Sequence, residues 1–277
     1  MRVESPTHRT CWDRVGRGHA FILAVGANTH CLKETHRDAR DFATAMQGLF
    51  NVPVNRTCVL DNAYRHEFVP ALERLAQVAK SDDLVIIYYS GHGTKLDDED
   101  GDETDGDKKD EAFVPVSVKP RKKYLLIDDD FSTLIGAIPT ENILTVIDAC
   151  FSASLTKLDR TDKPSEGPLK FLLWPWGNSN VDEPVITHVG DIDDVKGVLL
   201  SAAREGENAR ELPGRGGRFT VFFLEELKKA RSAQNVDLLA VFEKTRDRVS
   251  HHSREEQMPV AKGEEALFER INRFIVR

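Results

Sequence analysis

The chain has 277 residues, 40% of them apolar, and a formal net charge of −8 at pH 7. This length suits one large α/β domain, and the apolar share excludes a chain that is disordered over most of its length. The sequence contains no apolar run long enough to span a membrane as a helix.

Most of the negative charge lies in one stretch. Residues 94–111 hold ten acids and three lysines, a local charge of −7, so the rest of the chain is close to neutral. A nucleic-acid-binding protein needs a basic face, and the sequence shows none. We therefore expect neither a nucleic-acid partner nor a membrane partner.

The cysteines and the N-terminus predict the setting of the protein. The four cysteines are scattered and form no CxxC motif, which favours free thiols and a reducing, cytoplasmic location. Residues 1–18 are polar and lack the apolar stretch of a secretory signal, so we expect a polar extension before a single domain over residues 19–277. The cysteines are Cys11, Cys31, Cys58 and Cys150.

The first ninety residues alternate between two kinds of pattern. Residues 20–25 and 84–90 are continuous apolar runs typical of buried strands, and residues 54–60 predict a further strand between them. Apolar residues at helical spacing predict helices over 39–50 and 68–79. The order β-α-β-α-β predicts an α/β fold with a parallel sheet and helices on both faces.

The second half of the chain continues this pattern around one long irregular segment. After the acidic stretch we expect a hairpin arm at 112–118, a short helix opened by acids at 128–137, and a buried strand at 142–148. Residues 155–194 show no clear periodicity, and so long a loop is usually functional or disordered. The remaining expected elements are a strand at 197–201, helices at 219–230 and 236–249, and a closing segment at 267–276.

Two of the buried strands carry reactive side chains to their carboxyl ends. The strand at 84–90 is followed by Gly91-His92-Gly93, and the strand at 142–148 is followed by Cys150. Lone histidines and cysteines are usually structural, but the flanking glycines let a ligand approach His92 closely. Ligands bind at this edge of open α/β sheets, and neighbouring strands lie about 4.8 Å apart. If the two strands are neighbours, imidazole and thiol are within reach, as in a histidine-activated cysteine nucleophile.

These motifs together resemble the caspase-like cysteine peptidases of family C14, most closely the metacaspases and their bacterial relatives. The resemblance covers about residues 19–277 and implies a three-layer caspase-like fold. Two departures are Phe151-Ser152-Ala153, where metacaspases have His-Ser-Gly, and Asp148, where animal caspases have glutamine. The motifs that carry the resemblance lie at residues 89–93, 110–115, 127–130, 148–152, 200–203, 216–220 and 257–259.

The resemblance implies a mechanism. Cys150 attacks the scissile carbonyl, while His92 assists the thiol and protonates the leaving amine. The backbone N–H groups of Gly93 and Cys150 would form the oxyanion hole. A buried third member of a triad is not evident, and this family generally works as a dyad.

Charge indicates the substrate preference. Asp148 lies two residues before the cysteine, so it points to the same side if the strand continues. The resemblance places it with Asp38 and Ser90 in the pocket for the residue that precedes the cut. Two carboxylates in a partly dry pocket favour a cation, which predicts cleavage after Arg or Lys. The alternative for Asp38 is a place on the solvated face of its helix.

The acidic stretch has two interpretations. Charge runs are usually solvated, and this one does not match the EF-hand pattern. The resemblance implies a Ca²⁺ site at Asp110, Asp128 and Asp129, whose oxygen ligands suit that ion. The family's further ligand position falls on Lys157, which cannot coordinate a cation, and Asp159 is the candidate substitute. Calcium activation therefore stays open at this point.

The segment 155–194 lies where caspases are cut into a large and a small part. Its aromatic cluster at 171–176 lines a subsite, covers it in a resting state, or only pins the loop to the core. The resemblance also implies a protein or peptide substrate, and an upstream activator or a defence-system partner. Basic residues that a basic-specific enzyme could cut within itself are Lys157, Arg160, Lys163 and Lys170.

Two other classes of function compete with the peptidase. The first is a catalytically silent caspase-like scaffold or regulatory partner, and the presence of both His92 and Cys150 argues against it. The second is a nucleotide-binding module, which is disfavoured because no glycine-rich phosphate loop follows any strand.

Overall fold

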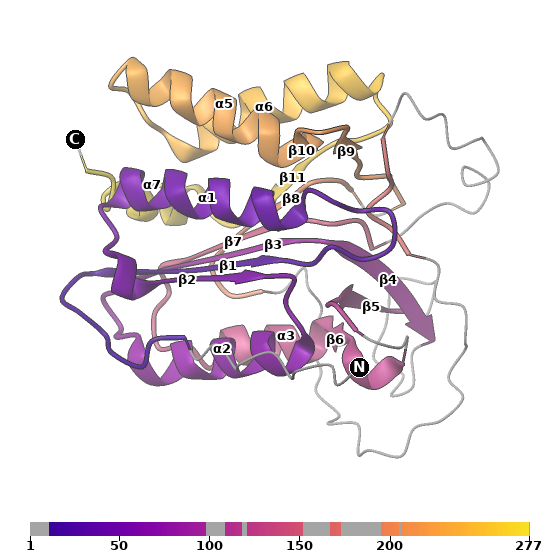
Figure 1. The fold of residues 1–277 in the computed structure, drawn as a ribbon. Coiled ribbons are helices and arrows are strands. Elements are labelled where there is room, and N and C mark those ends of the chain that lie inside the picture. Colours follow the sequence, from indigo (N-terminus) through magenta and orange to yellow (C-terminus); the bar gives the residue numbers. More distant parts are fainter. Residues whose placement is uncertain are drawn as a thin grey trace.

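The structure is a computed structural model that describes residues 11–97, 109–117, 121–151, 167–172, 195–204 and 206–276. A six-stranded sheet lies at its centre, between two layers of helices (Figure 1). All neighbouring pairs in this sheet are parallel except the edge pair β11–β8. In spatial order the strands are β11 (Val260–Lys262), β8 (Val198–Ser201), β7 (Ile143–Asp148), β3 (Leu84–Ser90), β1 (Ala20–Gly26) and β2 (Thr57–Asp61).

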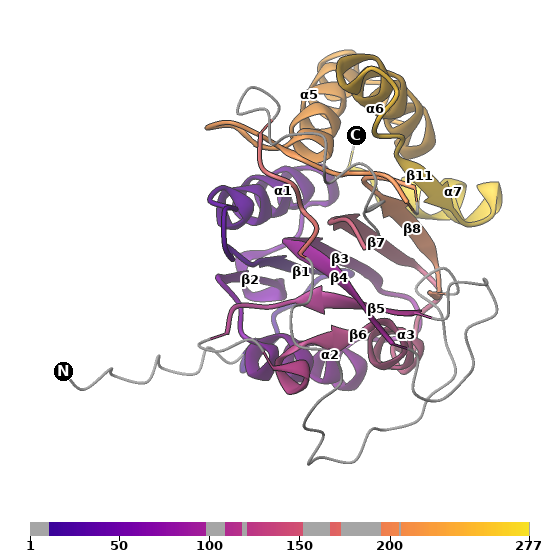
Figure 2. The same ribbon diagram turned by 90° about the vertical axis from the view of Figure 1, so that its right-hand side faces the viewer.

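Helices cover both faces of the sheet, as the sequence predicts (Figure 2). Alternate residues of β1 explain the two cores: Ile22 and Ala24 pack in one cluster, and Phe21, Leu23 and Val25 pack in the other. The first core includes residues of α1 (Thr35–Phe50), α5 (Arg218–Ser232), α6 (Leu238–Ser253) and α7 (Glu265–Asn272). The second includes residues of α2 (Arg65–Val78) and α3 (Asp128–Gly136).

A small antiparallel sheet includes both ends of the acidic stretch 94–111. It comprises β4 (His92–Asp97), β5 (Lys109–Val114) and β6 (Leu126–Ile127). The acidic stretch 94–111, for which no strand was expected, therefore begins and ends in strands. The sequence of β4 is too polar to show a strand pattern, and the strand forms because its backbone groups pair with β5, Gly93 facing Phe113 and Thr94 facing Ala112. His92 thus begins a strand.

Four further short elements, two 3₁₀ turns and two strands, are present in the described part of the chain. Residues 54–56, expected as strand, form the 3₁₀ turn Val54–Arg56, and a second such turn spans Lys122–Tyr124. Strands β9 (Glu211–Leu212) and β10 (Gly216–Gly217) make a short hairpin before α5. Gln257 joins separate elements here, because it accepts a hydrogen bond from Arg218 and donates one to the carbonyl of Ala202.

The N-terminal segment differs from the expected polar extension. Cys11 and Cys58 form a disulfide, with 5.7 Å between their Cα atoms. Trp12 is 5% exposed and packs edge-on against Phe21. The prediction of free thiols at these two cysteines is therefore wrong, since tertiary folding joins residues 47 positions apart. The cytoplasmic location loses this support and stays a prediction.

Within the described ranges, every helix is too short or too polar to cross a bilayer.

Candidate active site

The central strands bring the two reactive residues to one edge of the sheet. β3 and β7 are parallel neighbours, and their last residues, Ser90 and Asp148, face each other. The backbone N–H of Gly91 reaches the carbonyl of Asp148 at 3.4 Å. His92 follows the end of β3 by two residues, and Cys150 follows the end of β7 by two. The expected strand neighbourhood is therefore confirmed.

The imidazole of His92 is buried and held by a backbone carbonyl. Its Nε2 lies 3.1 Å from the carbonyl oxygen of Thr29, which assigns the ring proton to Nε2. Nδ1 is left as the acceptor, and it has no hydrogen-bond partner in the described structure. Burial lowers the pKa of His92 to about 4, although the bond to Thr29 acts in the opposite direction. At neutral pH the ring is therefore uncharged and its Nδ1 can accept a proton.

Thr29 orients the imidazole through its backbone, which is why the sequence gives no signal for it. It takes the place of the third member for which the sequence shows no candidate side chain.

The thiol of Cys150 is buried and bound to a backbone carbonyl. It donates a hydrogen bond to the carbonyl oxygen of Glu207 at 2.7 Å. His92 Nδ1 has no hydrogen-bond partner, so the thiol and the ring are not hydrogen-bonded to each other here. Proton transfer from the thiol to the ring therefore requires the hydrogen bond to Glu207 to break.

The two backbone groups expected to form an oxyanion hole meet at one oxygen atom. The N–H groups of Gly93 and Cys150 both donate to the carbonyl oxygen of Lys170, at 2.9 and 3.4 Å. Glycine is needed at position 93 because a Cβ there would lie 2.3 Å from the carbonyl oxygen of Cys150. The carbonyl of Lys170 thus lies where an oxyanion hole would hold the carbonyl of a substrate.

The segment around Lys170 is bound as an extended peptide. On the N-terminal side, residues 168–170 pair in an antiparallel manner with residues 209–211. The N–H of Lys170 donates to the carbonyl of Ala209, and the N–H of Glu211 donates to the carbonyl of Pro168, both at 2.9 Å. On the C-terminal side of Lys170, the N–H of Leu172 donates to the carbonyl of Gly93 at 2.9 Å. Hydrogen bonds on both sides of one residue are the pattern of a peptide lying in a groove.

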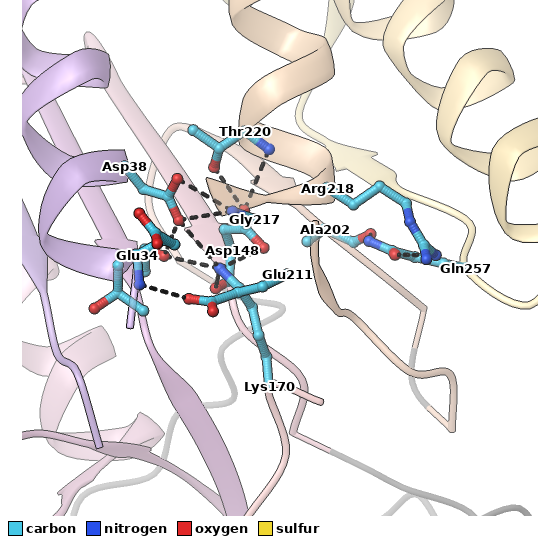
Figure 3. A network of polar contacts seen from close by, with 12 residues as sticks. Glu34, Asp38, Asp148, Lys170, Ala202, Glu211, Gly217, Arg218, Thr220 and Gln257 are labelled. Atoms are coloured by element: carbon cyan, nitrogen blue, oxygen red, sulfur yellow. Dashed lines mark hydrogen bonds and ion pairs between the residues drawn. The ribbon is translucent and has the colours of Figure 1, made fainter. Parts of the chain in front are cut away.

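The three predicted pocket residues surround the ammonium group of Lys170, and two of them, Asp38 and Asp148, can be seen beside it in Figure 3. Nζ lies 3.0 Å from a carboxylate oxygen of Asp148, 3.6 Å from one of Asp38, and 2.8 Å from the hydroxyl of Ser90. Lys170 is fully buried. Burial lowers its pKa, but the carboxylates of Asp148, Asp38 and Glu211 outweigh that effect and raise it above its usual value. Asp38 faces the pocket, so its placement on a solvated helix face is wrong.

Residues at the start of α5 hold the two carboxylates of the pocket in place by hydrogen bonds. Asp148 accepts hydrogen bonds from the hydroxyl and the backbone N–H of Thr220, at 2.6 and 3.2 Å, in the first turn of that helix. Asp38 accepts from the N–H of Gly217. A Cβ at position 217 would lie 1.9 Å from the carboxylate of Asp148, so only glycine fits. Residues 216–220 stood out in the sequence as a motif, but their contact with the pocket required the structure.

Asp38 gives the pocket a predicted pH dependence. Burial raises the pKa of Asp38 to about 6, and the charge of Lys170 partly offsets this. The carboxylate is therefore charged above about pH 6 and neutral below, so kcat/KM for a basic peptide should fall as the pH drops through that region. When Lys170 has left the pocket, the pKa of Asp38 should be somewhat higher, because the positive charge that lowers it is absent. His92, with a pKa of about 4, titrates below this region.

A pH profile of kcat/KM checks this prediction. Asp38→Asn should show lower activity and no step near pH 6. Persistence of the step in that variant would assign it to another group.

The three acids expected to bind calcium come from two neighbouring elements. Asp110 is on β5, Asp128 and Asp129 open α3, and all three are buried. The pairing of Ala112 with Ile127 brings β5 alongside the start of α3. However, the described residues contain no group of three or more His, Cys, Asp or Glu side chains that could hold a metal ion. They do not by themselves form a complete Ca²⁺ site, and the ion stays a prediction.

Several sequence predictions lie outside the described residues: the substitute ligand Asp159 with Lys157, the cut-site candidates Arg160 and Lys163, and the aromatic residues Trp174 and Trp176.

Fold and site together define a class: an α/β protein of caspase-like architecture, with a histidine, a cysteine and an acidic pocket at one edge of its sheet. Residues 17–266 match the family model of the caspase domain of peptidase family C14. The chain therefore belongs to the caspase-domain family.

Known relatives agree with this assignment. Metacaspase-7 of Arabidopsis thaliana is 31% identical over 151 residues, which is 45% of this chain and 36% of the relative. Metacaspase-6 of the same plant is 41% identical over 86 residues, 31% of this chain and 22% of the relative. The chain thus spans about a third of the first relative's length and less of the second's.

Solved structures share the fold. The protein GSU0716 from Geobacter sulfurreducens has a TM-score of 0.62 at 18% identity, covering 91% of this chain and 97% of the other. Caspase-1 from Spodoptera frugiperda has a TM-score of 0.53 at 14% identity, covering 93% and 96%. At these identities the likeness shows the caspase fold alone.

Proposed function

We propose that this protein is a cysteine endopeptidase that cleaves protein or peptide substrates after Arg or Lys, and that it cuts its own chain after Lys170. One observation carries the proposal. Lys170 has its carbonyl oxygen on the N–H groups of Gly93 and Cys150 and its ammonium group in the acidic pocket. A substrate residue that precedes a cut needs both positions at once.

The chemistry follows from the groups around this carbonyl. Once its hydrogen bond to Glu207 breaks, the thiol of Cys150 gives its proton to Nδ1 of His92, and the sulfur attacks the carbonyl carbon. The two N–H groups stabilise the negative oxygen that forms. The imidazolium then protonates the leaving amine, and water hydrolyses the thioester with the imidazole as base. The caspase-domain family of the chain supports this order of steps.

Peptide-library cleavage, measured with Ca²⁺ and with a chelator, tests this proposal. We expect cuts after Arg and Lys, and higher activity with Ca²⁺ if the acids at 110, 128 and 129 bind it. A preference for Asp would contradict the proposed pocket. Equal rates in both buffers would remove the metal from the proposal.

Self-processing gives a separate prediction. The purified chain should accumulate two fragments, residues 1–170 and 171–277, and the rate of this cut should fall at least about tenfold in Lys170→Ala, because the cation in the pocket is lost. Lys170→Arg should retain the cut. Intact-mass measurement over time checks this result, with Cys150→Ala as the uncut control. A first cut at another basic residue would contradict it.

A silent scaffold remains the second candidate, because the thiol faces the carbonyl of Glu207 and the pocket is filled by the chain itself. Labelling with an iodoacetamide probe or a peptidyl-ketone ending in Arg separates the two candidates. A peptidase should react at Cys150 faster than at Cys31, the exposed free cysteine. If the peptidyl-ketone never labels Cys150 and the chain stays uncut, the scaffold is favoured.

A further inference from the structure

Glu211 is a third acid at the pocket. It lies on β9 and is 2% exposed, and its carboxylate lies beside the ammonium group of Lys170 (Figure 3). Its oxygens accept hydrogen bonds from the backbone N–H groups of Lys33 and Glu34, at 3.3 and 3.1 Å. Its own N–H binds the carbonyl of Pro168. The same residue therefore holds the backbone of the bound segment and presents a carboxylate to its basic side chain.

The carboxylate of Glu211 has acceptor capacity left over. An ionised carboxylate offers about four acceptor positions, and the two backbone donors occupy two of them. Among the described residues, no Lys or Arg forms a direct ion pair with it. Burial of an acid without a cation in direct contact is unfavourable, and burial accordingly raises the pKa of Glu211. A cation that reached it would relieve this cost.

Lysine in the pocket does not make that contact because its donors are already used. An ammonium group has three N–H donors. Around Nζ of Lys170 there are three oxygen atoms within 3.0 Å: the hydroxyl of Ser90, the backbone carbonyl of Asp148 and the carboxylate of Asp148. Glu211 acts on this ammonium only through its charge. A guanidinium has five N–H donors in a planar fork, two more than those three acceptors require.

We propose that Glu211 makes the pocket prefer Arg to Lys, by accepting hydrogen bonds from guanidinium N–H groups that an ammonium lacks. This inference rests on the proposed cleavage after basic residues, and it names the residue that discriminates between the two. Removing its charge should therefore weaken binding of Arg much more than binding of Lys.

Matched peptides ending in Arg or Lys test the proposal. In Glu211→Gln we expect the Arg-to-Lys ratio of kcat/KM to fall about tenfold, with the Lys value within about twofold of wild type. Glu73→Gln, which removes an exposed acid on α2, should leave the ratio unchanged. An unchanged ratio in Glu211→Gln, or an equal loss for both peptides, would overturn the proposal. An equal loss would show that Glu211 only supports the backbone.

A second measurement needs no cleavage. In the Cys150→Ala chain, Lys170→Arg places the other basic side chain in the same pocket, and we expect it to raise the midpoint of thermal unfolding. Adding Glu211→Gln should abolish that rise. A rise of equal size with and without Glu211, or no rise at all, would overturn the inference. If the pocket shows this coupling but peptides are not cut, the proposed peptidase activity fails and the inference stands.

Discussion

Replacing Cys150 by alanine is expected to lower kcat/KM for an Arg peptide by at least about 10⁴-fold, the scale of a lost nucleophile. The self-cut after Lys170 should stop as well. The physical reason is that the other groups at the site can bind and polarise the carbonyl but cannot form the thioester. The residual rate should come from binding and from the N–H groups of Gly93 and the residue at 150 alone.

The fold should tolerate this change, because the side chain of Cys150 is small and alanine leaves little empty volume. Cys31→Ala is the matched control, since Cys31 is the other free cysteine and is exposed. It should keep wild-type activity. Steady-state kinetics together with a thermal melt check both variants. Cleavage by Cys150→Ala at a rate near that of wild type would remove the nucleophile from the proposal.

Asp148→Asn is expected to lower kcat/KM for Arg and Lys peptides by about 10²–10⁴-fold. Asp148 is fully buried, it forms the 3.0 Å ion pair with the ammonium of Lys170, and the first turn of α5 holds it in place. Removal of one partner of a buried ion pair costs about 3–5 kcal/mol, which corresponds to this change in rate. In one of its two orientations, the amide of the new asparagine would also point its N–H₂ group at the bound basic side chain, which is unfavourable.

The measurement for Asp148→Asn compares an Arg peptide with a citrulline peptide, a neutral side chain of similar shape. The variant should lose most of its preference for Arg, while cleavage of the citrulline peptide changes little. Asp83→Asn is the control: it removes another buried carboxylate, which pairs with Arg56 outside the site. That variant should lose stability but keep the preference. Retention of the Arg preference in Asp148→Asn would assign the cation to other groups.

The sequence predicted the central part of the fold because its signals are local. The apolar runs at β1, β3 and β7 and the helical spacing in α1 and α2 each depend on neighbouring residues only. The order of these elements then predicted a parallel sheet, which placed Ser90 and Asp148 at one edge. β4 was missed because its polar sequence becomes a strand only through pairing with β5.

Other features of the site had no local signal. Thr29 and Glu207 act through backbone carbonyl oxygens, which every residue possesses. The disulfide joins Cys11 and Cys58 across 47 positions. Lys170 was one of four basic residues in the long segment, and nothing in their spacing distinguished it. Its place in the pocket depends on pairing with residues 209–211 and with Gly93, which lie far from it in the chain.

The sequence by itself determined which side chains could do the chemistry, since the identity of His92, Cys150, Asp38 and Asp148 and the strands before three of them are local properties. Only the tertiary structure decided what those side chains face: a thiol turned to the carbonyl of Glu207, a ring held by Thr29, and a pocket filled by Lys170. These contacts join segments that lie far apart in the chain. Their geometry follows from how the layers pack, and no spacing along the sequence encodes it.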